Sequence, residues 1–533
     1  MSQIQLYDTT LRDGAQREGI SFSVEDKLKI VRKLDNLGVH FIEGGWPGAN
    51  PKDTEFFIQA KGLNLHNSRL AAFGSTRRPR IPAENDTVLK ALLGAGVPVV
   101  TIVGKSWDYQ VTQVLETTLE ENLAMIMESV QFLKGQGLTV FFDAEHFFDG
   151  FKANTEYAKK CLEAASRSGA DCIILCDTNG GTLPGEVTIA INTVKNVVST
   201  PLGIHAHNDG ELAVANTLAA VQAGATQVQG TVNGYGERCG NANLCSIIPA
   251  LQLKLGINCL STLQLAKLTE VARYVSEIGN LTPDPHLPYV GSSAFAHKAG
   301  YHVAAMMKAE KSYQHIDPGL VGNVKRVLIS ELSGKSNILY KAKERGLISN
   351  FNGNEAQKVL DQIKRLENQG YQYDGAEASF ELLIHRTEPG YRPPFELVDF
   401  MVIVENRRRA PTSGEGDVLA EAMVKVRVGG EIVHTAAEGN GPVNALDSAL
   451  RQALLRFYPL LHEVKLVDYK VRILEGTAGT ASQVRVLIES SNGNVEWRTV
   501  GSSSNIIEAS WYALVDSLEY CLWKGERSHE LST

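Results

Sequence analysis

Short apolar segments alternate with amphipathic helical patterns through the first half of the chain. The apolar segments have the length and composition of buried strands, and lie at residues 4–8, 41–45, 70–74, 99–103, 139–142, 172–177, 203–207 and 227–232. The stretches between them show the apolar spacing of helices. One such helix is predicted over residues 24–37, with Ser23 as its N-cap and Gly38 as its stop.

Regular alternation of strand and helix predicts parallel strands joined by right-handed crossovers. Eight such units in this length fit an α/β TIM barrel, (β/α)8, over residues 1–258. An open, doubly wound sheet is the alternative. It is disfavoured because no Gly-x-Gly-x-x-Gly follows the first strand segment.

Polar residues gather where the predicted strands end. A barrel brings the carboxyl ends of its strands onto one face, which is where the active sites of this fold lie. The residues concerned are Asp8, Arg12, Asp13, Glu43, Asp143, Glu145, the stretch 177–179, the stretch 205–209 and the stretch 233–241. Their recurrence at nearly every strand predicts a functional site at that pole.

His205 and His207 lie two residues apart on one predicted strand and therefore project to the same face. Asp13 follows the first strand and can reach the same pole. One carboxylate and two imidazoles suit a divalent metal with open coordination positions. The alternative is a pair of core histidines with ordinary hydrogen-bond partners.

Beyond the barrel the pattern changes twice. Residues 259–385 are mostly helical in pattern, with a helix expected over 260–277 and a proline-containing linker at 280–288. Residues 386–533 contain two similar stretches, in which 397–402 resembles 466–471 and 423–427 resembles 483–487. This self-similarity predicts an α+β domain of two βββα repeats, with helices opening at Asn444 and Asn505.

Composition limits the classes of partner and location. The net charge of −8 argues against nucleic acid or an anionic membrane as a partner. No apolar run is long enough to span a bilayer, and the chain opens on a strand pattern without a leader. The seven cysteines lack zinc or disulfide spacing, and Cys172 and Cys176 are expected to fill the core. These features predict a reduced, cytoplasmic protein.

Three motifs resemble the signatures of a known superfamily, the DRE-TIM metallolyases. They are the stretches 8–16 (Asp-Thr-Thr-Leu-Arg-Asp-Gly-Ala-Gln), 205–209 (His-Ala-His-Asn-Asp) and 233–241 (Asn-Gly-Tyr-Gly-Glu-Arg-Cys-Gly-Asn). The chain resembles the acyl-CoA-condensing branch, which comprises the 2-isopropylmalate, homocitrate and citramalate synthases. The run from Glu43 to Asp53 most resembles the citramalate synthases.

The resemblance implies roles for residues at the pole. Asp13, His205, His207 and Asn241 would hold a divalent metal such as Mn²⁺, Mg²⁺, Zn²⁺ or Co²⁺. The metal would bind the keto acid and polarise its carbonyl carbon.

Arg12 would stabilise an oxyanion, and its alternative role is an ion pair with Glu43 or Asp8. Glu145 matches a catalytic glutamate, with a structural pairing to Arg12 as its alternative.

Three further residues are implied to bind substrate. They are Gln16, Glu43 and Thr178. Thr178 would hydrogen-bond the substrate carboxylate, and the alternative is an ordinary turn residue.

The middle segment resembles the part of the family that covers the active site. His302 matches the candidate base that takes a proton from acetyl-CoA, and Tyr313 matches a tyrosine near the acyl-CoA site. His297 is the alternative base. Two departures bear on substrate choice: Ala304 stands where some citramalate synthases have an acid, and the stretch 297–300 equally resembles homocitrate synthase.

The repeats resemble the regulatory domain of the leucine-pathway synthases. Glycine-rich turns before two helices suit a ligand carboxylate at the helix N-termini. The residues expected to bind such an effector are Gly441, Asn444, Ser504 and Asn505, and the alternative is that these are structural turns only. The implied effector is a branched-chain amino acid, isoleucine above all. Packing of the repeats implies a homodimer or larger homo-oligomer.

The function expected is condensation of acetyl-CoA with pyruvate to citramalate, in isoleucine biosynthesis. The nearest alternatives act on 2-oxoisovalerate or 2-oxoglutarate. A different class is a hydroxymethylglutaryl-CoA-type lyase, against which the duplicated C-terminal domain argues. A third is a non-catalytic sensor, against which retention of residues such as Arg12, Asp13 and His302 argues.

Overall fold

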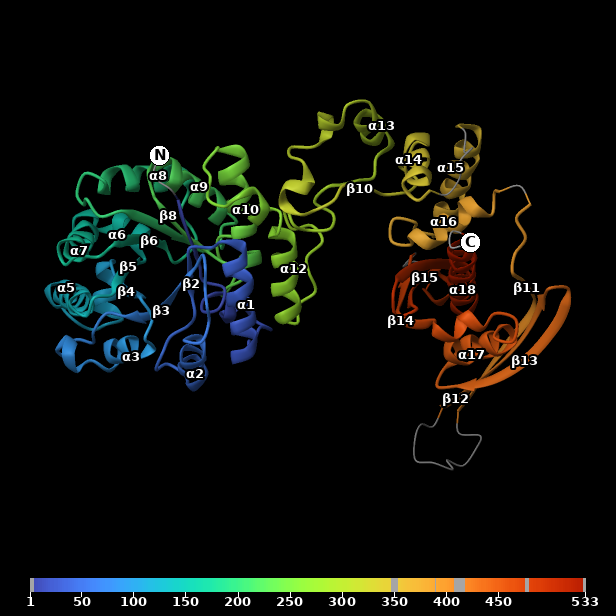
Figure 1. Ribbon diagram of the computed structural model, residues 1–533, viewed down its shortest axis with the longest axis horizontal. Helices are drawn as coiled ribbons and strands as arrows, with labels where there is room; N and C mark the ends of the chain where they lie inside the picture. Colours follow the sequence, from blue (N-terminus) through green and yellow to red (C-terminus); the bar gives the residue numbers. More distant parts are fainter. Residues whose placement is uncertain (1–3, 347–352, 389, 407–417, 475–478, 531–533) are drawn as a thin grey trace. The chain divides into compact units, whose positions relative to one another are not determined.

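A computed structural model describes residues 4–346, 353–388, 390–406, 418–474 and 479–530 (Figure 1). The chain forms two compact units, Met1–Phe295 with His315–Lys325, and Ala296–Gln314 with Arg326–Thr533. The predicted middle segment 259–385 therefore contributes to both units.

The first unit is built on a closed parallel barrel whose eight strands pair in sequence order (Figure 1). They are β1 (Gln5–Asp8), β2 (Phe41–Glu43), β3 (Arg69–Ser75), β4 (Val99–Lys105), β5 (Thr139–Glu145), β6 (Cys172–Asp177), β7 (Leu202–Ala206) and β8 (Gln227–Gly230). Closure occurs between β1 and β8, where Gln5 pairs with Gln227 and Asp8 with Gly230. The barrel prediction is confirmed, and the open sheet is wrong.

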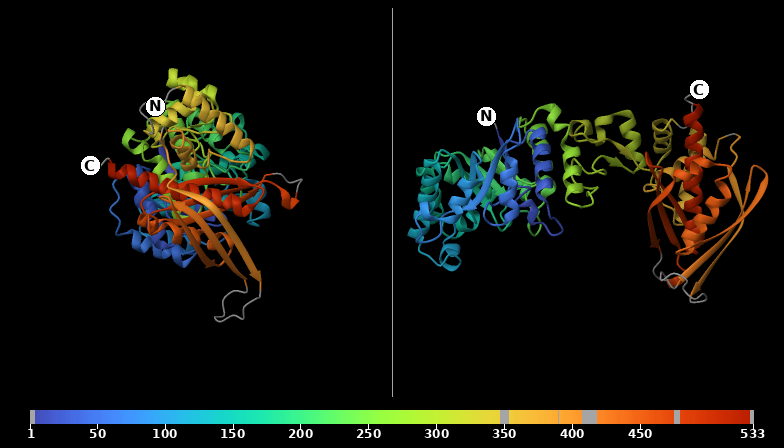
Figure 2. Two further views of the ribbon diagram at one scale, coloured as in Figure 1. Left: turned by 90° about the vertical axis from the view of Figure 1, so that its right-hand side faces the viewer. Right: turned by 60° about the horizontal axis from the view of Figure 1, so that its bottom comes forward.

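Helices surround this barrel in the alternating order that the sequence pattern predicts (Figure 2). They are α1 (Val24–Leu37), α2 (Pro51–Ala60), α3 (Thr87–Ala95), α4 (Asp108–Gln113), α5 (Leu119–Gly135), α6 (Phe147–Ala153), α7 (Thr155–Arg167), α8 (Pro184–Val194), α9 (Ala213–Ala223) and α10 (Leu244–Pro249). For α1, both the N-cap and the terminating glycine are those predicted from the sequence. Ser23 and Asp26 form a capping box, and Gly38 ends the helix with a φ of 94°.

Apolar side chains fill the inside of the barrel as well as the layer between strands and helices. Tyr7, Phe41 and Phe141 pack together inside, with Cys172 and Cys176 in the same cluster. The two cysteines are buried and unoxidised, as predicted. This packed interior gives the residues at the strand ends a rigid base.

After the barrel, the single helix predicted over 260–277 is two helices, α11 (Thr262–Leu265) and α12 (Leu268–Ile278). The break arises because the Lys267 N–H donates to the Gln264 carbonyl, three residues back, at 2.9 Å. This tight turn ends the first helix, and the second restarts one residue later.

In the second unit, a mainly helical segment precedes two repeats. The segment contains β9 (Ala296–His297), α13 (Gly300–Lys308), β10 (Arg326–Val327), α14 (Lys335–Glu344), α15 (Gly353–Asn368) and α16 (Glu377–His385). The first repeat is β11 (Phe395–Asn406), β12 (Val418–Val428), β13 (Glu431–Gly439) and α17 (Pro442–Leu454). The second is β14 (Lys465–Ile473), β15 (Val484–Ser491), β16 (Glu496–Ser503) and α18 (Ile506–Glu530).

The two repeats share details that confirm the predicted duplication. Each forms a three-stranded antiparallel sheet, in the orders β11-β12-β13 and β14-β15-β16. Each first strand has a register shift at the matching place, between Leu397 and Asp399 and between Leu466 and Asp468. Helix α17 packs on β12 and β13, and α18 packs on β15 and β16 (Figure 2).

Within the part of the chain that the structure describes, no helix combines the length and the apolar character that crossing a bilayer requires.

Candidate active site

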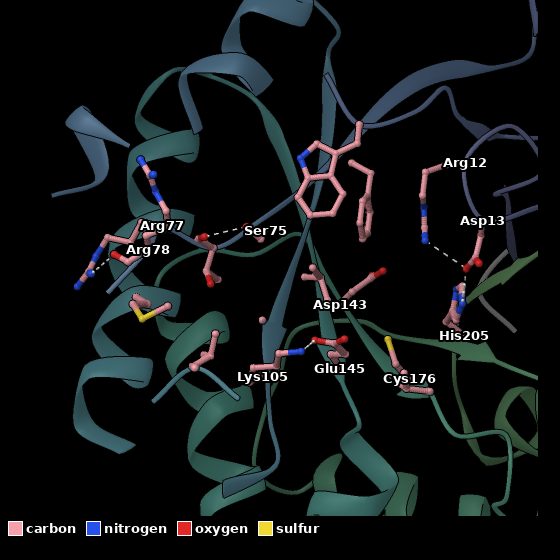
Figure 3. A pocket seen from close by; sticks show the side chains of 18 of the residues that line it. Arg12, Asp13, Ser75, Arg77, Arg78, Lys105, Asp143, Glu145, Cys176 and His205 are labelled. Atoms are coloured by element: carbon pink, nitrogen blue, oxygen red, sulfur yellow. Dashed lines mark hydrogen bonds and ion pairs between the residues drawn. The ribbon is translucent and has the colours of Figure 1, made fainter. Parts of the chain in front are cut away.

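A cavity of about 380 Å³ opens at the pole where the strands of the barrel end. Its lining comes from the ends of most strands, and Figure 3 shows part of it. Arg12, Asp13 and His205 lie together on one side of this view, and Lys105 and Glu145 point toward one another near its centre. The structure thus gathers residues far apart in sequence around one cavity.

Asp13, His205 and His207 form the centre of the site. Their ligand atoms all lie within 4.8 Å of one another, and all three residues are buried. The His205 Nε2 is 3.1 Å from the Asp13 Oδ2. Strand β7 ends at Ala206, so His207 stands at the start of the following loop rather than on the strand. The two imidazole rings still lie close together, with centroids 5.2 Å apart and planes inclined at 54°.

Asn241 lies beside this cluster because its backbone forms a bridge with that of His207. Its Nδ2 donates to the Tyr235 carbonyl at 3.2 Å, and its Oδ1 is buried. Neither this oxygen nor the buried Nδ1 of His207 has a hydrogen-bond partner among the described residues. A Cβ on Gly236 would lie 2.1 Å from the Asn241 Nδ2, so only glycine fits at position 236. Unpaired buried acceptors are the donor atoms that a metal ion needs, and the residues therefore fit a divalent cation.

The electrostatics of the cluster keep two of its ligands, Asp13 and His207, in a metal-binding state. Burial raises the pKa of Asp13, but the Arg12 charge and the hydrogen bond from His205 outweigh it and hold the pKa well below its ordinary value. Burial and the neighbouring His205 charge lower the pKa of His207 to about 4. For His205, the bond and charge of Asp13 outweigh burial and raise the pKa. Asp13 is thus ionised and His207 neutral at pH 7.

Arg12 is held on three sides. Its Nε donates to the Glu43 Oε1 at 2.5 Å, and its Nη1 lies 3.2 Å from the Asp13 Oδ2. The guanidinium carbon lies 3.9 Å from the centroid of the Phe73 ring. A guanidinium fixed in this way presents its remaining N–H groups to the cavity that it lines.

Glu43 is fully buried, and both of its oxygens are occupied. Oε1 accepts from Arg12, and Oε2 accepts from the Tyr7 hydroxyl at 2.7 Å. Of the two pairings that the sequence left open for Arg12, the structure has Glu43 and not Asp8, whose carboxylate accepts from Thr10. The substrate contact expected of Glu43 stays a prediction.

Glu145 and Thr178 both line the cavity, as does Gln16. Glu145 pairs with Lys105, whose Nζ lies 2.5 Å from Oε2, so the alternative of a pairing with Arg12 is wrong. The Thr178 hydroxyl accepts from the His146 N–H at 2.8 Å. Its O–H therefore remains available to donate, as the predicted substrate contact requires.

His302 lies on α13 in the second unit, and its ring stacks on that of Tyr313 with centroids 4.2 Å apart. The alternative base His297 lies in the short strand β9, whose neighbour Lys298 pairs with Asp374 at 2.9 Å. The stacking joins the two residues that the sequence assigned to acyl-CoA chemistry.

The expected effector residues lie at the starts of α17 and α18. Gly441 is the N-cap of α17, and the Asn444 Oδ1 accepts from the Asn440 N–H at 3.1 Å. The Asn505 Oδ1 accepts from the Ile507 N–H at 2.9 Å, and Ser504 is exposed. Helix α17 begins at Pro442, two residues before the predicted position. Proline is suited to the first turn, because the backbone N–H that it lacks would have no partner within the helix there.

Sequence reasoning missed several residues around the cavity. Lys105 and Phe73 contact predicted catalytic side chains, and Arg77 and Arg78 line the cavity near β3. Lys105 ends β4, which runs two residues beyond its predicted limit. A charged residue two positions after the predicted apolar strand 99–103 was the signal that would have found it.

Three protein families match successive parts of the chain. The HMGL-like family matches residues 3–275. The homocitrate synthase post-HMGL domain-like family matches residues 289–371, and the LeuA allosteric (dimerisation) domain matches residues 374–522.

The similarity to several curated relatives extends over nearly the whole chain. The (R)-citramalate synthase of Geobacter sulfurreducens is 55% identical over 99% of this chain and 99% of its own length. That of Aquifex aeolicus is 54% identical over 98% of each chain. A probable 2-isopropylmalate synthase of Methanopyrus kandleri is 32% identical over 96% of this chain and 97% of its own.

Among solved structures, the hydroxymethylglutaryl-CoA lyase of Pseudomonas aeruginosa matches with a TM-score of 0.46 and 18% identity. The match covers 58% of this chain and 99% of that one. This likeness is too low to bear on the chemistry of the site.

Proposed function

Because this chain belongs to the family of the (R)-citramalate synthases, we propose that it condenses acetyl-CoA with pyruvate and hydrolyses the thioester to release citramalate and CoA. The observation that carries the chemistry is the buried cluster of Asp13, His205 and His207 in the lining of the cavity. The similarity to relatives named (R)-citramalate synthases supports pyruvate as the acceptor, because citramalate is the product of condensing pyruvate with acetyl-CoA.

The proposed metal ligands are Asp13, His205, His207 and Asn241. A divalent cation held there would bind the carbonyl and carboxylate oxygens of the 2-oxo acid and polarise the carbonyl carbon. Mn²⁺, Mg²⁺, Zn²⁺ and Co²⁺ all accept such a set of oxygen and nitrogen donors. The unpaired atoms of His207 and Asn241 support this assignment.

The remaining residues bind the keto acid and handle charge. Thr178 and Gln16 line the cavity and are proposed to bind the substrate through its carboxylate. Arg12 donates to the oxygen that becomes negatively charged as the new carbon–carbon bond forms, which lowers the barrier. Because Glu43 and Phe73 already hold the guanidinium, little reorganisation accompanies that step.

His302 is proposed to take a proton from the methyl group of acetyl-CoA, and Tyr313 to orient the ring on which it stacks. The resulting carbon nucleophile attacks the keto carbon. Water then cleaves the thioester, with Glu145 at the cavity wall proposed to accept its proton.

A panel of 2-oxo acids tests the substrate. Initial rates of CoA release should give the highest kcat/KM with pyruvate, ahead of 2-oxoisovalerate and 2-oxoglutarate. A preference for 2-oxoglutarate would instead support the resemblance of residues 297–300 to homocitrate synthase. Release of acetyl-CoA from hydroxymethylglutaryl-CoA, without condensation, would indicate a lyase.

The C-terminal repeats are proposed to mediate feedback inhibition and pairing of two chains. The match to the LeuA allosteric (dimerisation) domain supports both roles. Apolar side chains such as Met401 and Val404 on β11 and Val467 and Ile473 on β14 are 47–61% exposed, which suits burial against a second copy. The proposed effector is isoleucine, bound by Gly441, Asn444, Ser504 and Asn505 at the helix starts.

We further propose that the chain works as three parts. They are a catalytic barrel at 1–258, a covering segment at 259–385 and a regulatory domain at 386–533. The family boundaries, at 275, 289, 371 and 374, fall near these divisions. A cytoplasmic location, without nucleic acid or membrane partners, remains the expectation from composition.

A further inference from the structure

Gln229 lies on β8, fully buried inside the barrel, and contacts a proposed metal ligand. Its Oε1 lies 2.9 Å from the Nδ1 of His205. Its Nε2 donates to the Asp143 Oδ1 at 3.3 Å and to the Gln227 Oε1 at 3.5 Å. The side chain therefore joins His205 to two acceptors on other parts of the barrel interior.

These neighbours fix which end of the Gln229 amide faces His205. The Nε2 of Gln227 donates to Gln5, so its Oε1 is free to act as an acceptor. A rotation of the Gln229 amide by half a turn would place its carbonyl oxygen against the oxygens of Asp143 and Gln227. The observed orientation avoids that repulsion and leaves the carbonyl oxygen facing His205.

A carbonyl oxygen beside Nδ1 selects one tautomer of His205. Nδ1 must carry the proton in order to donate to it, so the neutral ring keeps its lone pair on Nε2. Nε2 is the nitrogen that faces Asp13, at 3.1 Å. The opposite amide orientation would place the proton on Nε2 and block that atom as a ligand.

We propose that Gln229 is a positioning residue that holds His205 in the tautomer and ring orientation needed for metal binding through Nε2. This inference rests on the proposed metal site. Acceptors of this kind behind a ligating histidine raise its basicity and restrict its rotation, and their loss weakens metal binding.

Titration of Mn²⁺ into the metal-free full-length protein, followed by calorimetry, tests the proposal without reference to turnover. Gln229→Met keeps the size of the side chain but removes the acceptor, and should weaken Mn²⁺ binding by about 10- to 100-fold. Gln229→Glu combined with Asp143→Asn keeps an acceptor for Nδ1–H and lets the new amide donate to the second glutamate oxygen, so this double variant should bind within about threefold of wild type. Thr101→Val removes a buried polar group elsewhere in the barrel, the hydroxyl bonded to Tyr7, and as the matched control should bind as wild type does.

Circular dichroism and thermal melting should confirm that each variant is folded. If Gln229→Met does not fold, Gln229→Asn takes its place, because the shorter side chain withdraws the acceptor from His205. Mn²⁺ binding by Gln229→Met that is as tight as wild type overturns the proposal, as does equal weakening in the Gln229→Glu/Asp143→Asn double variant. A wild-type protein that binds Mn²⁺ but condenses no 2-oxo acid would overturn the proposed function and leave this inference standing.

Discussion

The pole of the barrel and the helix starts of the two repeats differ in whether their polar side-chain atoms have hydrogen-bond partners. At the pole, His207 Nδ1 and Asn241 Oδ1 are buried without partners among the described residues. At the repeats, the amide oxygens of Asn444 and Asn505 already accept backbone N–H groups.

The difference bears on how strongly each region indicates a ligand. A buried polar atom without a partner costs free energy unless something binds it, so the pole is incomplete on its own. Asn505 caps its own helix, and Asn444 is bonded to the turn before α17, so both amide oxygens are satisfied with or without an effector. The metal site is therefore supported by the geometry, whereas the effector site rests on the family match and the repeat pattern.

The largest effect is expected at the pole. His207→Ala should reduce kcat/KM by at least about 10³-fold, because loss of metal-assisted polarisation removes several kcal/mol of transition-state stabilisation. The protein should remain folded, since the histidine makes no other side-chain hydrogen bond among the described residues. Steady-state kinetics and calorimetric Mn²⁺ titration measure the two losses.

His286→Ala is the matched control, because the His286 side chain is 80% exposed and should not affect either quantity. Treatment of wild type with a chelator should reproduce the loss, and Mn²⁺ should restore activity. Full turnover in a chelated, metal-free sample would contradict the site.

The support of Arg12 should show the next largest effect. Glu43→Gln removes the charge that holds the guanidinium and should lower kcat by about 10²-fold. Tyr7→Phe removes only the hydroxyl that bonds the other oxygen of Glu43, and should cost less. Steady-state kinetics with pyruvate measures both variants. Equal, small losses in the two variants would mean that Arg12 does not depend on this support.

The repeats should control regulation and not chemistry. Truncation near Arg392 should abolish inhibition by isoleucine, since the proposed effector residues are then absent. The loss of pairing surface on β11 and β14 should also lower activity to a smaller extent. Titration of isoleucine into intact and truncated protein, with leucine and valine alongside, tests this. If no branched-chain amino acid binds or inhibits the intact enzyme, the repeats are a dimerisation module only.

The smallest effect is expected at Asn505, where two substitutions distinguish helix capping from effector binding. Asn505→Ala should destabilise α18 by about 1 kcal/mol through loss of the bond to Ile507, whereas Asn505→Ser keeps a cap. If Asn505 also binds the effector, both variants should weaken the isoleucine response. Thermal melting and isoleucine titration together distinguish the roles. A normal isoleucine response in Asn505→Ser would leave the residue as a cap alone.

Prediction from sequence succeeded wherever a local pattern carried the information. The strands β6 and β7, the helix α1 with its caps, and the duplicated βββα order follow from periodicity and from turn residues. The convergence of Asp13, His205 and His207 also followed, because parallel strands bring their carboxyl ends together. The break between α11 and α12 could not be predicted from the sequence, since a single tight turn leaves the apolar spacing almost unchanged.

What the sequence by itself determined is the order of elements and the identity of the groups at the pole. Asp13, His205 and His207 are placed there by strand ends and by a two-residue spacing, and such short-range signals survive in the sequence. The tertiary structure alone decided how those groups are held. Glu43 supports Arg12, Lys105 pairs with Glu145, and Gln229 faces His205. These partners come from neighbouring strands or the loops after them and meet only when those strands pair, so no local pattern could pair them.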